Sequence, residues 1–455
     1  MSHERVKNLT EGNPLKLILN FTLPLLLGNL FQQTYNIVDS AIVGQTLGAN
    51  ALGSVGVSSS VQFLVLGFVT GSMTGFAIPV AAAFGAKKES EMRRYVYNGA
   101  VWATIIAVVL TAATGILTPS ILRLLKTPGE LYEDAYAYLL TIFLGLPATV
   151  LYNFLSSVLR AVGDSRTPFL FLALSSLLNI GLDLFCIINL RMGVFGAAFA
   201  TVISQAVSGI LCVILVVRKF PILHIRKEER IYSGAMSRRV LNMGLPMGLQ
   251  FSITAIGSMV MQTANNSLGT VYVSAYAAGL KIKQFAMSPF DALGAAISTY
   301  ISQNFGAGKM ERIEHGIRIG EKIAVLYGIG IGIVLIFFGR DLSLIFMNGD
   351  AVDVLNASAQ YLRTLGFFYW LLGILIVTRS SVQGIGWSRQ AVLAGVIEMF
   401  ARTVVSVFLV KKLSYAAICM ADPTAWGTAT LYLIPTLKAA LHWADNEILH
   451  HSSNY

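Results

Sequence analysis

The most constraining feature of the chain is a series of long apolar runs, the first of which is Leu15–Val43. A helix needs roughly 20 largely apolar residues to cross a hydrocarbon core about 30 Å thick. In lipid, only helices and closed barrels satisfy their own backbone hydrogen bonds. We therefore predict an all-α polytopic membrane protein with twelve transmembrane helices, at Leu15–Val43, Leu52–Phe84, Val96–Leu117, Tyr136–Leu159, Pro168–Leu190, Val194–Val217, Val240–Asn266, Ala275–Phe305, Glu321–Phe338, Tyr361–Val382, Gln390–Val410 and Ala417–Ala440.

The composition and the placement of charge favour the same class. Of the 455 residues, 55% are hydrophobic and only 12% are charged, whereas a soluble domain carries roughly 25% charged residues. The net charge of +10 lies mainly in short connections, as the positive-inside bias predicts, rather than in a patch for nucleic acid. We predict a multi-pass protein of a bacterial-type inner membrane, with both termini cytoplasmic and the lipid bilayer as its surroundings.

The two halves of the chain resemble each other. Three pairs of similar motifs are separated by nearly the same distance, 221–223 residues: Phe84–Lys88 with Phe305–Lys309, Leu159–Arg166 with Val382–Arg389, and Leu23–Pro24 with Leu245–Pro246. Six spans in each half make this a parallel repeat. We predict an amino-terminal lobe (1–217), a basic cytoplasmic linker (218–239) and a carboxy-terminal lobe (240–455).

The first span holds two residues that are unusual in a membrane helix. Asp39 is ionisable, and an ionisable group inside a span is costly and by default a functional-site hypothesis. Pro24 removes a backbone donor and favours a bend. We therefore predict that Asp39 binds a cation and that Pro24 acts as a hinge.

Together these motifs resemble the multidrug and toxic compound extrusion (MATE) family over nearly the whole chain. The resemblance rests on the Leu-Pro…Asp first span, the two Phe-Gly-Ala motifs, the stretch Arg160–Pro168, the pair Asn179 and Asp183, and Asp422–Trp426. It implies two lobes arranged as a V and export of cationic drugs coupled to inward H⁺ or Na⁺. It also implies a cation site at Asp39, Asn179, Asp183 and Thr201.

The residue types of this site agree with the implied role. Asn179 and Asp183 are four residues apart, so they share one face of a helix. Their oxygens, with Asp39 and Thr201, form a set of hard ligands that suits Na⁺, with Asp39, Asn179 and Asp183 as the metal ligands. Two close carboxylates also favour a proton. The choice between the ions stays open, and the alternative is that these groups are hydrogen-bonded contacts between helices.

The carboxy-terminal half lacks the acids that some members of the family carry in the seventh and tenth spans, so we expect no cation site of that kind there. Asp291 is predicted either as a counter-charge for a cationic drug or as a partner for Lys281 or Lys283. Glu398 and Arg402 are four residues apart and are predicted to form an intrahelical ion pair.

A substrate cavity is expected to use amide, aromatic, thioether and acidic side chains, because methionine and aromatic groups suit promiscuous binding of apolar cations. Packing or lipid contact is the alternative for each of them. The predicted cavity residues are Gln33, Tyr35, Met261, Gln262, Met287 and Asp291.

These features predict a secondary exporter that exchanges cationic or amphipathic drugs for H⁺ or Na⁺, confers antibiotic resistance, functions as a monomer and needs no cofactor. The first alternative is a flippase or exporter for lipid-linked oligosaccharides or metabolites, which the scarcity of Lys and Arg within the spans disfavours. The second is a membrane-embedded enzyme, for which paired catalytic groups such as His with Asp are not found.

Overall fold

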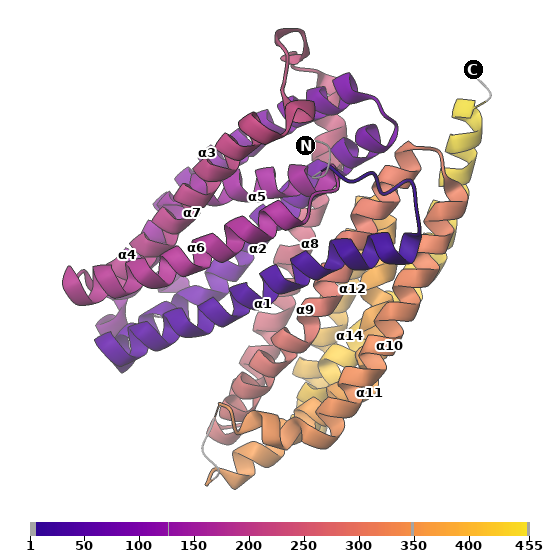
Figure 1. The fold of residues 1–455 in the computed structure, drawn as a ribbon. Helices are drawn as coiled ribbons and strands as arrows, with labels where there is room; N and C mark the ends of the chain where they lie inside the picture. Colours follow the sequence, from indigo (N-terminus) through magenta and orange to yellow (C-terminus); the bar gives the residue numbers. More distant parts are fainter. Residues whose placement is uncertain (1–5, 126, 347–349, 453–455) are drawn as a thin grey trace. The chain divides into compact units, whose positions relative to one another are not determined.

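A computed structural model of the protein describes residues 6–125, 127–346 and 350–452, and all regular structure in these ranges is helical (Figure 1). The first half contains α1 (Pro14–Leu47), α2 (Ala49–Gly85), α3 (Glu89–Leu124), α4 (Gly129–Leu144), α5 (Leu146–Ala161), α6 (Arg166–Leu184) and α7 (Gly193–Lys219). The second half contains α8 (Gly234–Asn266), α9 (Thr270–Gly306), α10 (Met310–Ser343), α11 (Val352–Ile385), α12 (Ser388–Thr403), α13 (Val410–Leu413) and α14 (Tyr415–Ser452).

These helices correspond one by one to the twelve predicted spans. The bent pair α4–α5 forms the fourth span, with 45° between its halves, and α12 with α13 forms the eleventh. Within the described ranges, nine spans are long and apolar enough to cross a membrane, and the bent pair is a tenth. The other two, α9 and α14, are equally long but carry charged side chains such as Lys283 and Asp422.

The contacts divide the chain into two compact units. Unit 1 comprises Met1–Asn8 and Leu27–Gly248, and unit 2 comprises Leu9–Leu26 and Leu249–Tyr455. The units differ from the predicted lobes because α1 and α8 each contribute one part to each unit. Both helices pass from one unit to the other two residues after a proline, Pro24 in α1 and Pro246 in α8.

Unit 1 is a bundle in which α2 packs on α4 and α5, and α7 packs on α5 and α6. The first part of α8 joins it through very small residues. A Cβ atom on Gly75 of α2 would lie 2.6 Å from the Cα atom of Gly244 in α8. Glycine at these positions therefore permits close approach of the two helices, as is common in membrane bundles.

Unit 2 is built around α9, α10, α11 and α14, and its largest fully buried side chains include Tyr300, Tyr361, Tyr369 and Trp426. Ile18, Phe21 and Leu25 from the first part of α1 belong to this core. The α10–α11 pair is the most extensive helix contact. At its centre, Gly332 of α10 and Gly366 of α11 bring the two backbones close together.

The fifth and eleventh spans share an irregularity that the sequence did not predict. A π-helical turn, Phe185–Asn189, follows α6, and a second, Val404–Leu409, follows α12. Each turn begins two residues after a buried charged residue, Asp183 in the first case and Arg402 in the second. Such turns are rare and frequently occur at functional sites.

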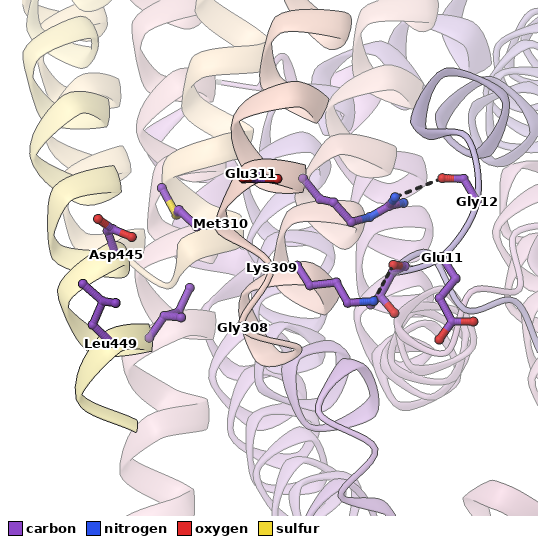
Figure 2. Close-up of a pocket in the computed structure, with 11 residues that line it drawn as sticks. Glu11, Gly12, Gly308, Lys309, Met310, Glu311, Asp445 and Leu449 are labelled. Atoms are coloured by element: carbon purple, nitrogen blue, oxygen red, sulfur yellow. Dashed lines mark hydrogen bonds between the residues drawn. The ribbon is translucent and has the colours of Figure 1, made fainter. Parts of the chain in front are cut away.

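The segments that precede α1 and α8 are each tied to a unit by polar contacts. In unit 2, Lys309 Nζ donates to the carbonyl of Thr10 at 2.9 Å, and Arg312 Nη1 donates to that of Gly12 at 3.0 Å (Figure 2). These residues line a groove of about 680 Å³ that also includes Asp445. It contains none of the predicted site residues.

The corresponding contact in unit 1 lies in the linker between α7 and α8. Arg93 Nε of α3 donates to both carboxylate oxygens of Glu229, at 2.7 and 2.9 Å, and Glu229 is 3% exposed. The backbone N–H of Arg226 also donates to Glu229, at 2.9 Å. These hydrogen bonds, chiefly those from Arg93, lower the pKa of Glu229 to about 2.

Candidate functional site

The turn before α6 determines where the predicted cation ligands lie along that helix. Gly163 has φ of +86°, and a Cβ atom there would clash with the carbonyl of Lys7, so glycine is required. Asp164 then caps α6, because its Oδ1 atom accepts hydrogen bonds from the backbone N–H groups of Arg166 at 2.9 Å and Thr167 at 3.0 Å. The motif Arg160–Pro168 therefore has a local structural role in addition to marking the family.

Asn179 and Asp183 lie one turn apart on α6, and Thr201 of α7 is their neighbour. The Asn179 amide nitrogen donates to Oδ2 of Asp183 at 3.3 Å, and the amide oxygen lies 3.3 Å from the hydroxyl of Thr201. Asn179 is 2% exposed and Asp183 is fully buried. The amide thus holds the Asp183 carboxylate on the inner face of α6.

α1 adds the second carboxylate to this cluster. Asp39 is 9% exposed, and its carboxyl group lies within hydrogen-bonding reach of that of Asp183. Two carboxyl groups can hydrogen-bond to each other only when one of them holds a proton. The Oδ1 atoms of both residues have no hydrogen-bond partner among the described residues. The arrangement therefore offers free oxygens and a strong electrostatic reason to take up a positive charge.

The structure brings the four predicted cation-site residues together within unit 1, and it adds two that the sequence analysis missed. The phenol of Tyr138 in α4 lies near Asp39, Tyr35 and Gln62 of α2. Tyr138 is 5% exposed. No spacing rule connects α2 and α4 to α6, so only the fold could identify these groups.

The groups of this cluster that can bind a cation are hard oxygen ligands. Within the described ranges, no group of three or more His, Cys, Asp or Glu side chains is placed to hold a metal ion. Two carboxylates, an amide and a hydroxyl remain, and oxygen donors of this kind suit hard cations. The cluster fits Na⁺ through its oxygens and H⁺ through the contact between its carboxyl groups.

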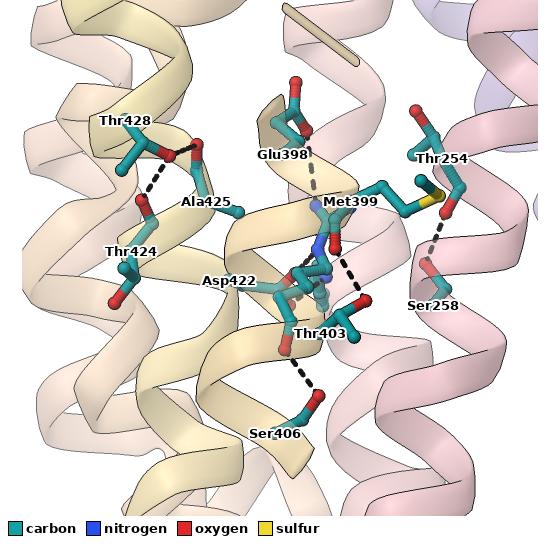
Figure 3. A network of polar contacts seen from close by, with 12 residues as sticks. Thr254, Ser258, Glu398, Met399, Thr403, Ser406, Asp422, Thr424, Ala425 and Thr428 are labelled. Carbon is teal, nitrogen blue, oxygen red and sulfur yellow. Dashed lines mark hydrogen bonds and ion pairs between the residues drawn. The ribbon is translucent and has the colours of Figure 1, made fainter. Parts of the chain in front are cut away.

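Unit 2 contains a second buried polar cluster, which links charges from four helices. Figure 3 shows the two acids of this cluster, Glu398 and Asp422. Asp422 of α14 accepts from Arg402 Nε of α12 at 2.7 Å and pairs with Lys283 of α9. Arg402 Nη2 lies 3.4 Å from Glu398, which also pairs with Arg379 of α11. We call these five residues the unit 2 charge network.

The network decides two sequence predictions. The intrahelical ion pair of Glu398 with Arg402 is confirmed. The suggestion that Asp291 pairs with Lys283 or Lys281 is wrong, because Lys283 pairs with Asp422 and Lys281 lies over the ring of Phe346 at 5.5 Å.

The network also weakens the sequence-based argument against a flippase for lipid-linked oligosaccharides, which rested on the scarcity of Lys and Arg within the spans. The basic side chains of Lys283, Arg379 and Arg402 lie largely buried within spans, although such residues were expected to be scarce there. Hydropathy alone does not reveal them, because each is a single charge in a long apolar helix.

The predicted substrate-cavity residues belong to both units. Gln33 and Tyr35, on α1, are partly buried in unit 1. In unit 2, Gln262 and Asp291 are exposed and Met287 is partly buried against the core. Met261 is 1% exposed and packs in the core of unit 2, so it contributes packing there.

Comparison with known proteins adds independent findings. The family described as MatE matches residues 24–185 and, a second time, residues 246–408. The second match begins 222 residues after the first, which is the separation of the internal motifs. Each match starts at the proline near which α1 or α8 changes unit.

Individual proteins are similar over most of their length. A protein of Bacillus subtilis (strain 168), described as probable multidrug resistance protein YpnP, is 31% identical over 395 residues, which cover 86% of this chain and 87% of the relative. An FAD transporter of Shewanella oneidensis is 23% identical over 80% of each chain. A crystal structure described as MATE in the bent conformation has a TM-score of 0.90 and 21% identity and covers 99% of this chain and 100% of its own. The last likeness confirms the predicted all-α fold.

Proposed function

Because this multi-pass membrane protein belongs to the MATE family, whose members are transporters and not enzymes, we propose that it is a secondary active multidrug exporter. It exchanges cationic or amphipathic small molecules for H⁺ or Na⁺ and uses no other cofactor. It acts as a monomer in the bacterial cytoplasmic membrane, with both termini in the cytoplasm. The description of a relative as a probable multidrug resistance protein supports drugs as the cargo.

The observation that carries the proposal is the cluster of Asp39 and Asp183 with Asn179 and Thr201. Two neighbouring carboxylates in membrane spans, one from α1 and one from α6, are stable only if a cation or proton offsets their charge or a rearrangement separates them. The cluster with a bound cation or proton and the cluster without one should therefore favour different packings of the helices in unit 1. Drug binding and cation binding then oppose each other, and each weakens the other by the same factor.

Pro24 supplies a place for the required movement. It lies inside α1, fifteen residues before Asp39, and two residues before the helix passes from unit 2 to unit 1. A proline inside a helix removes a hydrogen bond and permits a kink. Charge neutralisation at Asp39 can thus be coupled to a bend in the same helix.

The proposal is tested by drug efflux from energised membrane vesicles under separate H⁺ and Na⁺ gradients. The variants are Asp39→Asn and Asp183→Asn, and the control is Asp134→Asn, which alters an exposed acid of α4 in the same unit. We expect ethidium efflux to require one of the two gradients and to fall at least about tenfold in both site variants, since each removes a group on which coupling depends. Gradient-driven efflux that survives in both site variants would place coupling elsewhere.

A second candidate function follows from a separate observation. The buried cations Lys283, Arg379 and Arg402, together with the relative described as an FAD transporter, favour an exporter of anionic metabolites or of lipid-linked oligosaccharides. The same vesicles distinguish the two functions, because this candidate predicts efflux of a phosphorylated cargo and no efflux of ethidium.

A further inference from the structure

The segment that precedes α1 is held by polar side chains of unit 2. The backbone N–H of Leu9 donates to Oε1 of Gln303 at 2.9 Å. The carbonyl of Leu9 accepts from Asn304 Nδ2 at 3.3 Å and from Arg312 Nη2 at 3.2 Å. Gln303 and Asn304 are fully buried, and Leu9 is 2% exposed. A buried backbone group without a partner is costly, so these side chains fix the path of the segment.

Two cations complete the attachment. Lys309 and Arg312 each donate to a further backbone carbonyl between Leu9 and α1 (Figure 2). Arg312 Nε also donates to Oδ1 of Asn304 at 3.0 Å, and the guanidinium lies over the buried ring of Tyr300 at 5.8 Å. Hydrogen bonds from charged donors are stronger than those from neutral ones. We call the four side chains that hold the segment the α1 clamp: Gln303, Asn304, Lys309 and Arg312.

The clamp lies where the chain enters unit 2. The segment Leu9–Leu26 belongs to unit 2, and the chain on either side of it belongs to unit 1. The clamp holds the beginning of this segment, and apolar side chains such as Ile18 and Phe21 hold its middle in the core of unit 2. Pro24 lies near its end. A bend of α1 at Pro24 thus has one arm attached to unit 2, and the other arm carries Asp39.

The segment before α8 is held in a similar way by unit 1. Ile231 lies 222 residues after Leu9, and its carbonyl accepts from Nδ2 of Asn98 in α3 at 3.2 Å. Asn98 is fully buried. The internal repeat places Ala82, and not Asn98, opposite Asn304. Different side chains therefore hold equivalent carbonyls of the two halves, which favours a function of the attachment itself.

We propose that the α1 clamp fixes the first part of α1 to unit 2, so that charge neutralisation at Asp39 bends the helix at Pro24 and does not swing it as a whole. This inference rests on the proposed export function and gives Asn304 and Arg312 the role of positioning residues in it. With the clamp released, both arms of α1 could move together. Movement of the arm that carries Asp39 would then no longer be transmitted to unit 2.

Hydrogen exchange of purified protein tests the clamp without any drug or ion gradient. Arg312→Gln removes charge-assisted hydrogen bonds to two backbone carbonyls. We expect peptides that cover residues 9–23 to exchange at least about tenfold faster in this variant, because the arm attached to unit 2 loses its hold. Peptides that cover residues 27–47 should change by less than about twofold. Arg312→Lys should give an intermediate rate, since it keeps a charged donor.

Arg318→Gln is the matched control, because it alters an exposed arginine of α10 that pairs with Glu314 one turn away. It should leave the exchange of both ranges unchanged. Equal exchange of residues 9–23 in the intact protein and in Arg312→Gln would overturn the inference. A uniform rise in both ranges would also overturn it, since that result indicates a general loss of packing. If Arg312→Gln does not fold, Arg312→Lys and Lys309→Gln decide the matter by the same comparison.

Transport measurements separate this inference from the export proposal. In vesicles, we expect Arg312→Gln to slow gradient-driven ethidium efflux at least about fivefold, while the affinity of the purified protein for ethidium changes by less than about twofold. A clamp that only stabilised the fold would lower rate, affinity and Tm together. An efflux rate equal to that of the intact protein would overturn the positioning role. If the intact protein shows no efflux, the export proposal fails, and hydrogen exchange still decides whether the clamp holds α1.

Discussion

At the scale of single residues, the cost of charge in a membrane explains which side chains matter. Asp39 and Asp183 lie in different helices, yet their carboxyl groups meet within unit 1. Asn179 and Thr201 make hydrogen bonds that a purely apolar bundle would not need. A cluster of this kind is stable when a cation or a proton occupies it, so this occupancy can control the conformation of unit 1.

The acidic members of this cluster could be predicted because an aspartate in an apolar run stands out in the sequence. Asn179 and Thr201 were implied by the resemblance to the family, and the four-residue spacing of Asn179 and Asp183 agrees with that assignment. Tyr138 and the unit 2 charge network could not be predicted in the same way. Their partners are brought together by packing between helices that are distant in sequence, and no periodicity reports such contacts.

The ion pair of Arg93 with Glu229 leads to a prediction about pH. The pKa of Glu229 in the folded protein is about 2, below the ordinary glutamate pKa of about 4.3. The charged form of Glu229 therefore stabilises the fold at pH values above that ordinary pKa. That stabilisation is lost as the pH falls toward 2. Glu229→Gln should lower stability at neutral pH by about 2 kcal/mol, since the buried guanidinium of Arg93 then keeps only the largely exposed Glu89 as an acidic partner.

The measurement is the Tm of purified protein at a series of pH values. The difference between the intact protein and Glu229→Gln should be largest at neutral pH and should shrink below pH ~4. Glu228→Gln changes an exposed neighbour and should follow the intact protein. A difference that does not depend on pH would contradict the role given to the ion pair.

At the scale of helices, small residues decide how closely the spans pack. In the α10–α11 pair, a Cβ atom on Gly332 would meet the backbone carbonyl of Gly366, whereas one on Gly330 would meet nothing within 4 Å. The sequence predicts both helices from their apolar runs. It does not predict which glycine faces the partner helix, because that depends on the rotation of each helix about its axis.

We expect Gly332→Ala to destabilise unit 2 by about 1–3 kcal/mol, because overpacking forces the two backbones apart. Gly330→Ala serves as its matched control and should be neutral or slightly stabilising, since alanine favours the helix over glycine. The Tm values of both variants in one detergent test this directly. A Gly332→Ala protein as stable as the Gly330→Ala protein would mean that the close approach does not limit packing.

At the scale of the whole chain, the internal repeat is the feature that organises both units. The motif pairs, the two MatE matches and the positions of Pro24 and Pro246 share one separation of about 222 residues. The sequence therefore predicted the repeat and the number of spans. It placed the division in the linker, whereas the contacts show that α1 and α8 each contribute to both units, because apolar patterning does not reveal which bundle a half-helix joins.

The repeat also shows how two related halves have come to carry different chemistry. The fifth span places Asp183 just before its π-helical turn, and the eleventh places Arg402 just before its own. Unit 1 thus presents an acidic cluster and unit 2 a mixed network with an excess of positive charge. We therefore propose that ion coupling belongs to the acidic cluster of unit 1.

The central claim is that the Asp39–Asp183 cluster links cation binding to drug binding. Its most direct test is the affinity of purified protein for a fluorescent drug at a series of pH values and Na⁺ concentrations. We expect drug affinity to fall as one of these ions binds, and we expect this dependence to disappear in Asp39→Asn and Asp183→Asn while Asp134→Asn retains it. A dependence that remains intact in both site variants would contradict the account.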